Sequence, residues 1–232
     1  RSYDQIIHDI ALQKLNVVFA IDRAGIVGDD GETHQGIFDV SYLNLVPNMI
    51  ITAPKDATEL DALLKFAING NFGPFAIRYP RGESVNFGDE FIDTIEFGKW
   101  QVLNASDAND ICIIAYGNCI KYAMQALEEL KSNGINPHII NARFIKPFDT
   151  KMFSDILNTF NNIIIMEENT YIGSLGQTLI YHAYLNSNGK YPKIKHIALP
   201  DAFIEQGDSE FLRHKYFLSK DNLIETIYNF LK

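Results

Sequence analysis

A polar, glycine-rich segment between residues 22 and 36 carries the side chains best suited to chemistry. It reads Asp22-Arg-Ala-Gly-Ile-Val-Gly-Asp-Asp-Gly-Glu-Thr-His-Gln-Gly36. Arg23 supplies a hydrogen-bond donor, Asp30 an acceptor, and His34 a proton carrier. The glycines of this segment allow tight turns and a close approach of the backbone to a ligand. These residue types favour a site that binds a small polar substrate and moves a proton.

The same segment, called the 22–36 loop below, also has a simpler interpretation. Asp30-Gly31 is a common turn dipeptide, and His34 could cap a helix. An ordinary surface loop would contain the same residues, so residue types and spacing alone leave both interpretations open.

The elements that must position this loop follow from the hydrophobic pattern. A short apolar run directly before the loop is typical of a buried parallel strand. The pattern predicts strands over Asn16–Asp22, Met49–Thr52 and Phe75–Tyr79, a core-facing helix over Tyr3–Leu12, and a helix over Asp56–Asn69 that Asp56 and Glu59 begin as a capping box. Helices that alternate with buried strands indicate an α/β sheet covered on both faces, with ligands at the carboxyl ends of the strands.

A second α/β series follows a charged, mixed stretch between Gly82 and Gly98. It comprises expected strands over 111–116, 138–141, 163–166 and 193–199, expected helices over 119–132, 150–159 and 174–186, and one or two final helices over 209–231. We therefore predict one domain over residues 1–84, a linker over 85–97 and a second, complete domain over 98–232. Because Arg1 is followed at once by a helical pattern without a cap, we expect the chain to be a piece of something longer.

Composition excludes several classes of function. The 232 residues include 20 basic and 29 acidic side chains, a net charge of −9, and no basic cluster, which argues against a nucleic acid partner. The sequence has no long apolar run and no secretory leader, so we expect a cytoplasmic protein without a membrane partner. The two cysteines, Cys112 and Cys119, match no disulfide framework or zinc spacing, so no metal site is expected in this chain.

Other polar residues have structural interpretations. We expect Cys119, near a helix start, to be a small buried hydrophobic residue, because a reactive thiolate would need a basic partner beside it. Glu167 and Glu168 could form an acid–base pair, but no donor cluster accompanies them, which favours a strand-end turn or an interface. Surface or packing positions are expected for the scattered histidines, namely His138, His182, His196 and His214.

Several longer motifs point to one family. In the first half they are Asp22-Arg-Ala-Gly25, Gly31-Glu-Thr-His-Gln-Gly36 with Phe38-Asp39 and Ser41-Tyr-Leu43, and Arg78-Tyr-Pro-Arg-Gly82. In the second half they are Arg143-Phe-Ile-Lys-Pro147, Glu167-Glu-Asn169, Gly173-Ser-Leu-Gly176 and Leu199-Pro-Asp201. On these motifs the chain resembles the 1-deoxy-D-xylulose-5-phosphate synthases, a family of the transketolase superfamily. The resemblance implies an α/β fold in which a truncated pyrimidine-binding transketolase domain precedes a complete transketolase C-terminal domain.

The resemblance also implies a reaction and roles for four residues. Enzymes of this family condense pyruvate with D-glyceraldehyde 3-phosphate, with loss of CO2, to make a precursor of isoprenoids, thiamine and pyridoxal. By resemblance, Arg23 and Arg81 hold the phosphate, which suits the fixed fork of a guanidinium group. Asp30 accepts a hydrogen bond from a sugar hydroxyl, and His34 contacts the acceptor and helps proton transfer. Arg78 is interpreted instead as one member of an ion pair at a strand end.

Cofactors and partners follow from the same resemblance. The complete enzyme would use thiamine diphosphate and Mg2+, but this chain has neither the Gly-Asp-Gly diphosphate–magnesium motif nor the activating glutamate, which belongs upstream of Arg1. We therefore expect the chain alone to bind the cofactor poorly and to be inactive. Its expected partners are the missing N-terminal portion of the enzyme and, in a homodimer, a second copy.

Two alternatives remain open. One is a β-subunit-like portion of a 2-oxoacid dehydrogenase or of another transketolase-type enzyme; Arg23 and Arg81 speak against a dehydrogenase, because its unphosphorylated acid has no phosphate to hold. The other is a non-catalytic assembly module, which would predict loss of the loop residues. Arg23, Asp30, His34 and Arg81 are all present.

Overall fold

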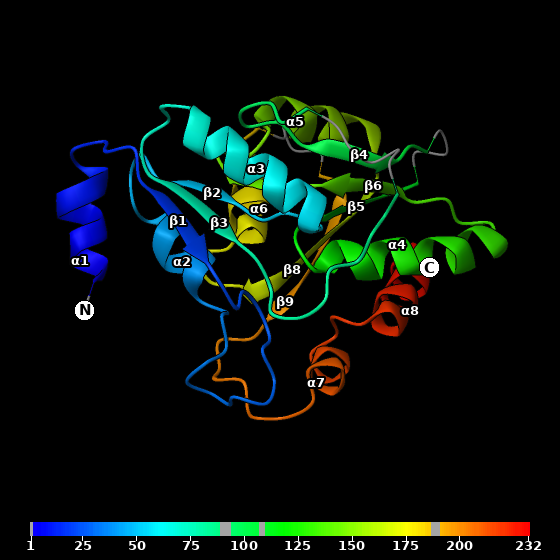
Figure 1. Cartoon of the computed structure of the whole chain (residues 1–232). Helices are drawn as coiled ribbons and strands as arrows, with labels where there is room; N and C mark the ends of the chain where they lie inside the picture. The colour runs from blue at the N-terminus through cyan, green and yellow to red at the C-terminus, as the bar shows by residue number, and fades with distance from the viewer. Residues whose placement is uncertain (1, 89–93, 107–109, 187–190) are drawn as a thin grey trace.

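Two β-sheets form the centre of the protein (Figure 1). The structure is a computed structural model that describes residues 2–88, 94–106, 110–186 and 191–232. The strands are β1 (Val18–Ile21), β2 (Ile50–Thr52), β3 (Phe75–Arg78), β4 (Gln101–Asn104), β5 (Ile111–Ala115), β6 (His138–Asn141), β7 (Phe144–Lys146), β8 (Asn162–Thr170) and β9 (Lys193–Leu199). The first sheet has the order β1-β3-β2-β7, and the second has the order β4-β6-β5-β8-β9.

The helices, with the exception of α2, lie close to where the hydrophobic pattern predicts them. They are α1 (Tyr3–Gln5), which continues as the π-helical segment η1 (Ile6–Ala11), α2 (Asp39–Asn44), α3 (Ala57–Asn69), α4 (Cys119–Ser132), α5 (Thr150–Thr159), α6 (Leu175–Asn186), α7 (Ser209–Lys215) and α8 (Lys220–Leu231). The predicted cap of α3 is confirmed, because Asp56 Oδ1 accepts a hydrogen bond from the Glu59 backbone N–H at 2.8 Å. The Glu59 carboxylate reaches the backbone N–H of Lys55 rather than that of Asp56, so the capping box is only half formed.

The first sheet contains strands from both halves of the chain: β1, β2 and β3 from the first half and β7 from the second. β1, β3 and β2 are parallel, as predicted, and β7 pairs antiparallel with β2 through Ile51 and Lys146. Because β7 follows residue 98, the second predicted domain supplies the last strand of the first sheet. The sequence pattern missed β7, and it also missed β4 and α2.

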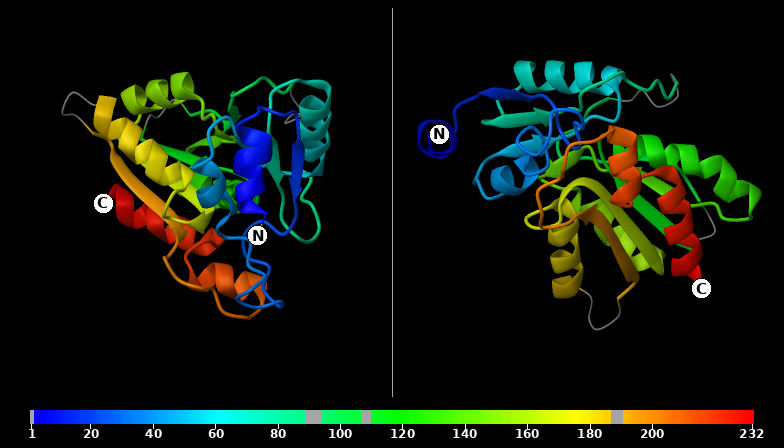
Figure 2. Two further views of the ribbon diagram at one scale, coloured as in Figure 1. Left: turned by 90° about the vertical axis from the view of Figure 1, so that its left-hand side faces the viewer. Right: turned by 90° about the horizontal axis from the view of Figure 1, so that it is seen from below.

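The second sheet is covered by helices on both faces (Figure 2). Alternate residues of β5 face opposite sides, as strand geometry requires. Cys112 and Ile114 join the apolar cluster that contains residues of α5 and α6, whereas Ile111 and Ile113 join the cluster under α4, α7 and α8. This arrangement confirms the prediction of an α/β sheet buried on both sides.

Two boundaries differ from the predictions or lie partly outside the described residues. β8 continues from the predicted end at Met166 to Thr170, so Glu167, Glu168 and Asn169 lie inside a buried strand. The predicted linker over 85–97 includes residues 89–93, which are outside the described residues. The described parts of that segment, 85–88 and 94–97, contain no helix or strand.

The N-terminal helix packs only in part. Tyr3, Ile6 and Ile7 contact the core and Ala11 is buried, which supports a core-facing helix, whereas Leu12 is largely exposed. Among the described residues, none of the helices has both the length and the apolar character needed to cross a membrane.

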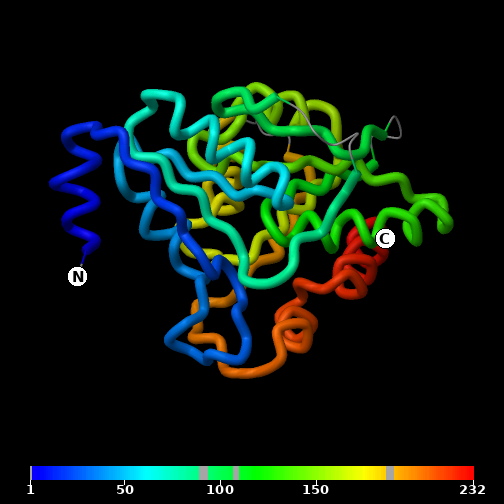
Figure 3. The backbone as a smooth tube through the Cα atoms, viewed as in Figure 1, coloured from blue at the N-terminus to red at the C-terminus, as the bar shows by residue number. Residues whose placement is uncertain are grey.

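The fold brings the 22–36 loop beside a distant part of the chain. The loop follows β1, and Figure 3 shows it next to the segment that leads into α7. Hydrogen bonds join the two segments, from the Gln35 side chain to the Glu205 carbonyl and from the Gln206 side chain to the Asp29 carbonyl. The loop therefore lies between the first sheet and the C-terminal part of the chain.

Candidate functional site

The 22–36 loop is closed at its base by backbone hydrogen bonds. The Gly25 N–H donates to the Gly36 carbonyl at 2.6 Å, and the Gly36 N–H donates back to the Gly25 carbonyl at 2.8 Å. A Cβ atom on Gly36 would lie 1.9 Å from the Arg23 carbonyl oxygen, so only glycine fits there. The Ala24 N–H donates to the carbonyl of Tyr79, which ties this base to the end of β3.

Two of the four predicted site residues are in direct contact. Arg81 Nη1 lies 2.8 Å from Asp30 Oδ2, which joins the segment after β3 to the loop after β1. The Arg81 side chain is 52% exposed and the Asp30 side chain is 33% exposed. Because water reaches both groups, a ligand can also reach them.

His34 lies on the same loop and is exposed. Its Nδ1 atom lies 3.0 Å from the Thr33 hydroxyl oxygen, and its backbone N–H donates to the Gly31 carbonyl. Since Thr33 occupies Nδ1, Nε2 is the ring nitrogen available for proton exchange with a ligand.

Arg23 occupies a special backbone position. Its φ angle is +61°, in the left-handed region that side-chain-bearing residues rarely adopt. Its backbone N–H donates to Asp22 Oδ1 at 2.6 Å, which holds this turn. Within the described ranges, the exposed Arg23 guanidinium has no ion pair or hydrogen bond with Asp30, His34 or Arg81. The structure thus pairs Asp30 with Arg81 and leaves Arg23 and His34 as separate groups.

Arg78 forms a buried ion pair, as the sequence analysis predicted. Its Nε and Nη2 atoms donate to the two carboxylate oxygens of Asp39 at 2.7 and 3.1 Å, and only 4% of Arg78 is exposed. Nη2 also donates to the carbonyl oxygens of Gly36 and Glu168. Burial alone would lower the pKa of Arg78, but the charge of Asp39 raises it, so the guanidinium stays charged.

The prediction that no donor cluster accompanies the two adjacent glutamates is wrong for Glu168. Its Oε1 atom accepts hydrogen bonds from the Ile26 N–H at 2.9 Å and from Arg213 Nε at 2.8 Å. Its Oε2 atom accepts one from the Asn118 side chain at 3.3 Å. These donors come from three segments far from Glu168 in the sequence, so no local pattern indicates them.

Glu167 is also surrounded by donors, and His196 is one of them. Glu167 accepts from the Tyr116 hydroxyl at 2.8 Å and from the Gly176 N–H at 2.7 Å, at the start of α6. His196 Nε2 lies 2.7 Å from Glu167 Oε1, so the expectation that His196 only packs or lies at the surface is wrong. Burial would raise the pKa of Glu167, but the hydrogen bond and charge of His196, with Tyr116 and Gly176, hold it below its ordinary value. Glu167 therefore joins β5, β8, β9 and α6.

Two protein-family models match the two halves of the chain. Residues 98–223 match the model of the transketolase C-terminal domain, and residues 1–85 match that of the transketolase pyrimidine binding domain. The chain belongs to the transketolase family. The predicted order of the two transketolase domains is confirmed, while the boundaries at residues 84 and 98 stay predictions.

Curated relatives of this transketolase-family chain are named 1-deoxy-D-xylulose-5-phosphate synthase, which confirms the resemblance to that family. The relative from Dictyoglomus thermophilum is 46% identical over 233 residues, covering 100% of this chain and 37% of the relative. Those from Clostridium botulinum strain Alaska E43 and Aquifex aeolicus are 45% and 42% identical, covering 99% and 100% of this chain and 36% of each relative. The chain thus spans little more than a third of the length of these relatives.

Solved structures share the whole arrangement. A split-gene transketolase, solved as an inactive β4 tetramer, superimposes with a TM-score of 0.86 at 26% identity and covers 100% of this chain and 72% of that chain. Transketolase from Campylobacter jejuni subsp. jejuni NCTC 11168 superimposes with a TM-score of 0.72 at 21% identity, covering 95% of this chain and 32% of that chain. The second similarity shows the shared fold alone.

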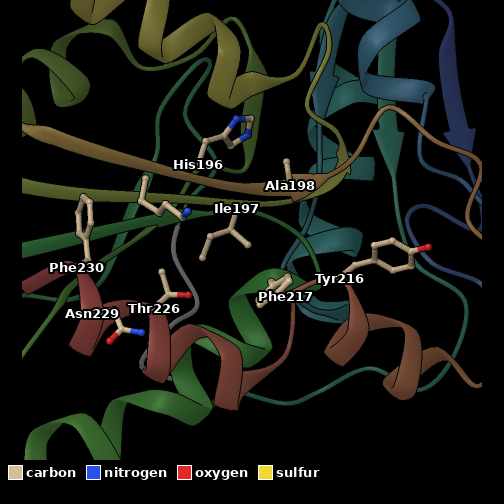
Figure 4. A pocket seen from close by; sticks show the side chains of 9 residues that line it. His196, Ile197, Ala198, Tyr216, Phe217, Thr226, Asn229 and Phe230 are labelled. Carbon is tan, nitrogen blue, oxygen red and sulfur yellow. The ribbon is translucent and has the colours of Figure 1, made fainter.

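The transketolase chain also contains a cavity away from the loop. A space of about 460 Å3 lies between β9 and α8 (Figure 4). It is lined by Lys195, His196, Ile197, Ala198, Tyr216, Phe217, Thr226, Asn229 and Phe230, and by none of the four predicted site residues. In Figure 4 the His196 ring and the Ile197 side chain point to opposite sides of β9. The candidate site is therefore the open loop rather than this cavity.

The remaining cysteine and histidine predictions can be compared with the structure. Cys119 is buried, and burial raises the pKa of its thiol, which confirms the prediction of a small buried residue. His138 and His182 pack against phenylalanine rings, as expected. His214 is exposed and lies 3.2 Å from the Ser219 hydroxyl.

The pyrimidine-binding family model and the synthase relatives point to thiamine diphosphate as the cofactor. Among the described residues, no group of three or more His, Cys, Asp or Glu side chains is placed to hold a metal ion. The buried carboxylates of Glu167 and Glu168 are both engaged by protein donors. The loop residues stay predicted substrate-binding residues.

Proposed function

We propose that this chain forms the C-terminal third of a synthase that condenses pyruvate with D-glyceraldehyde 3-phosphate to give 1-deoxy-D-xylulose 5-phosphate and CO2. The observation that carries the proposal is the accessible Arg81–Asp30 ion pair on the 22–36 loop. Relatives of that name, at 42–46% identity across this chain, support it. The enzyme would work in the cytoplasm and supply precursors of isoprenoids, thiamine and pyridoxal.

In this proposal the chain binds the phosphorylated acceptor. Arg81 and Arg23 both present exposed guanidinium groups, which suit a phosphate because their donors form a planar fork. Asp30 holds Arg81 in place and offers its second carboxylate oxygen to a sugar hydroxyl. Before the substrate arrives, Arg81 and Asp30 pair with each other, so neither of these two charges is unpaired. A phosphate bound to Arg81 would then share the guanidinium with Asp30.

His34 would exchange a proton with the acceptor through Nε2, because Thr33 occupies its other ring nitrogen. When bound, thiamine diphosphate supplies the electron sink for loss of CO2 from pyruvate. The chain alone would hold neither this cofactor nor Mg2+, and would be inactive. The upstream part of the enzyme would supply the activating glutamate and the diphosphate–magnesium motif.

A second copy of the chain is the other proposed partner. Helix α6 buries Leu175, Leu179 and Ala183 against the core. On its other side Tyr181 and Leu185 are 63% and 60% exposed. Helices with apolar residues on both sides are usually buried on both sides. The exposed apolar side of α6 therefore supports a homodimer that forms through this helix.

The experiment is a coupled assay of the complete enzyme with pyruvate, D-glyceraldehyde 3-phosphate, thiamine diphosphate and Mg2+. Arg81→Ala should raise KM for D-glyceraldehyde 3-phosphate roughly ten- to a hundredfold, because a charge-assisted contact with the phosphate is lost. KM for pyruvate should change much less. The matched control is Lys65→Ala, which removes an exposed cation paired with Asp61 on α3.

Equal changes in both Michaelis constants would reject the phosphate role of Arg81. Absence of product from the unsubstituted complete enzyme would reject the proposed reaction itself. Activity on a 2-oxoacid with no need for a phosphorylated acceptor would favour a dehydrogenase β-subunit instead.

A further inference from the structure

The backbone of Ile26, in the 22–36 loop, is held by a buried ion pair from the other half of the chain. The Ile26 N–H donates to Glu168 Oε1 at 2.9 Å, and the Ile26 carbonyl accepts from Arg213 Nη2 at 2.9 Å. Glu168 and Arg213 also pair with each other, with Nε 2.8 Å from Oε1. One ion pair therefore provides hydrogen-bond partners for both the backbone N–H and the backbone carbonyl of Ile26.

This ion pair is shielded from water. Glu168 is 4% exposed and Arg213 is 5% exposed. Hydrogen bonds to charged groups are stronger than those between neutral groups, and they gain strength where water is excluded. Of the other links between the loop and the C-terminal part, the hydrogen bond from Gln206 to the Asp29 carbonyl is exposed and that from Gln35 to the Glu205 carbonyl is only partly buried. The Glu168–Arg213 pair is thus a buried anchor of the loop.

Gly25 allows the carboxylate to come this close. Its φ angle is +82°, and a Cβ atom built on it would lie 2.6 Å from the carboxyl carbon of Glu168. Glu168 could not move aside freely, because Ile26, Arg213 and Asn118 all donate to it. The close contact between the loop backbone and the Glu168 carboxylate therefore requires glycine at position 25.

We propose that Glu168 and Arg213 are positioning residues for the acceptor substrate. They do not carry the chemistry; they fix the start of the segment that presents Asp30 and His34, at the point where α7 and β8 meet the loop. This inference rests on the proposed function, because it assigns Asp30 and His34 to the acceptor. A misplacement of reacting groups by about 1 Å can lower a rate roughly a hundredfold.

The test uses the complete enzyme with Glu168→Gln and, separately, Arg213→Met. Each should lower kcat/KM for D-glyceraldehyde 3-phosphate roughly ten- to a hundredfold while KM for pyruvate stays near its original value. The matched control is Glu59→Gln. Glu59 also forms a buried ion pair, with Arg143 at 3.2 Å, but it lies on α3 and does not contact the loop.

A second measurement does not depend on the reaction. Hydrogen exchange of this chain should show faster exchange of the amides of residues 26–28 in Glu168→Gln than in Glu59→Gln, with β5 equally protected in both. If a single variant fails to fold, the double variant Glu168→Gln/Arg213→Met removes both charges and leaves no unpaired buried charge. It should show the same loss of kcat/KM, because neither new side chain restores both bonds to Ile26.

The outcomes separate the two proposals. An inactive unsubstituted enzyme would reject the proposed function. An active enzyme in which Glu168→Gln and Glu59→Gln have the same kcat/KM would overturn the positioning role. Equal exchange rates at residues 26–28 in these two variants would also overturn it, because the loop would then be held by other contacts.

Discussion

Arg78 and Arg81 show how position divides two identical side chains between structure and substrate binding. Arg78 is the last residue of β3, 4% exposed and bound at two points to Asp39. Arg81 follows the strand, is 52% exposed, and has a single contact with Asp30. Both lie in one motif, Arg78-Tyr-Pro-Arg-Gly82, but only Arg81 is accessible to a ligand.

Replacing Arg78 should therefore destabilise the fold. Arg78→Met should lower the free energy of unfolding by about 3–5 kcal/mol, because it leaves the Asp39 charge buried without its partner. Lys65→Ala, which breaks an exposed pair with Asp61, should cost about 0.5 kcal/mol or less. Urea denaturation monitored by circular dichroism measures both values, and equal costs would contradict the structural role of Arg78.

At the residue scale, motifs could predict the exposed loop residues but not those that hold them. Arg23, Asp30, His34 and Arg81 lie in short local patterns. The role of Glu168 cannot be read from such a pattern, because its partners Ile26 and Arg213 are 142 and 45 residues away in the sequence. The one available signal was the placement of two adjacent glutamates directly after an apolar strand, where a buried charge needs partners.

At the scale of elements, local signals were sufficient for the longer helices and insufficient for the short helix α2 and for the antiparallel strands. α3, α4 and α5 have clear hydrophobic periodicity, and Asp56 and Asp149 cap two of them. β7 is a three-residue strand whose partner in the sheet, β2, lies far from it in the sequence, so its sequence alone carries no strand signal. β8 was predicted too short because its polar end is stabilised by donors from other elements.

The fit between the loop and β8 can be tested by adding one methyl group. Gly25→Ala should lower the free energy of unfolding by about 1–3 kcal/mol more than Gly134→Ala does, because the new Cβ collides with the fixed Glu168 carboxylate. Gly134 is the matched control: its φ of +78° is similar to the +82° of Gly25, but no atom lies within 4 Å of its Cβ position. Guanidinium denaturation measures both, and equal losses would show that the carboxylate can move aside.

At the scale of the whole molecule, the transketolase fold and the order of its two domains could be predicted from motifs and alternation. The sequence did not predict that β7, from the second half of the chain, joins the first sheet. The exposed apolar side of α6 was also hidden in the sequence, because an apolar helix has the same composition whether its outer side meets solvent or a partner.

The proposed homodimer predicts the effect of charges on that side of α6. The double variant Tyr181→Lys/Leu185→Lys should weaken self-association at least about tenfold, because two ammonium groups would be buried at the interface. Sedimentation velocity over a concentration series measures this shift. Lys151→Ala, on the exposed side of α5, is the control and should leave association unchanged. An unchanged sedimentation profile in the double variant would place the contact elsewhere.

The strand β7 has a consequence for folding cooperativity. It belongs to the second half of the chain by sequence and to the first sheet by hydrogen bonding, so the first half does not complete its own sheet, whereas all strands of the second sheet come from the second half. A break in the polypeptide between residues 85 and 97 would leave β2 as an uncovered edge, which in isolation favours pairing with other chains. The two transketolase domains should therefore melt together in a single transition, as one thermodynamic unit built from two sequence units.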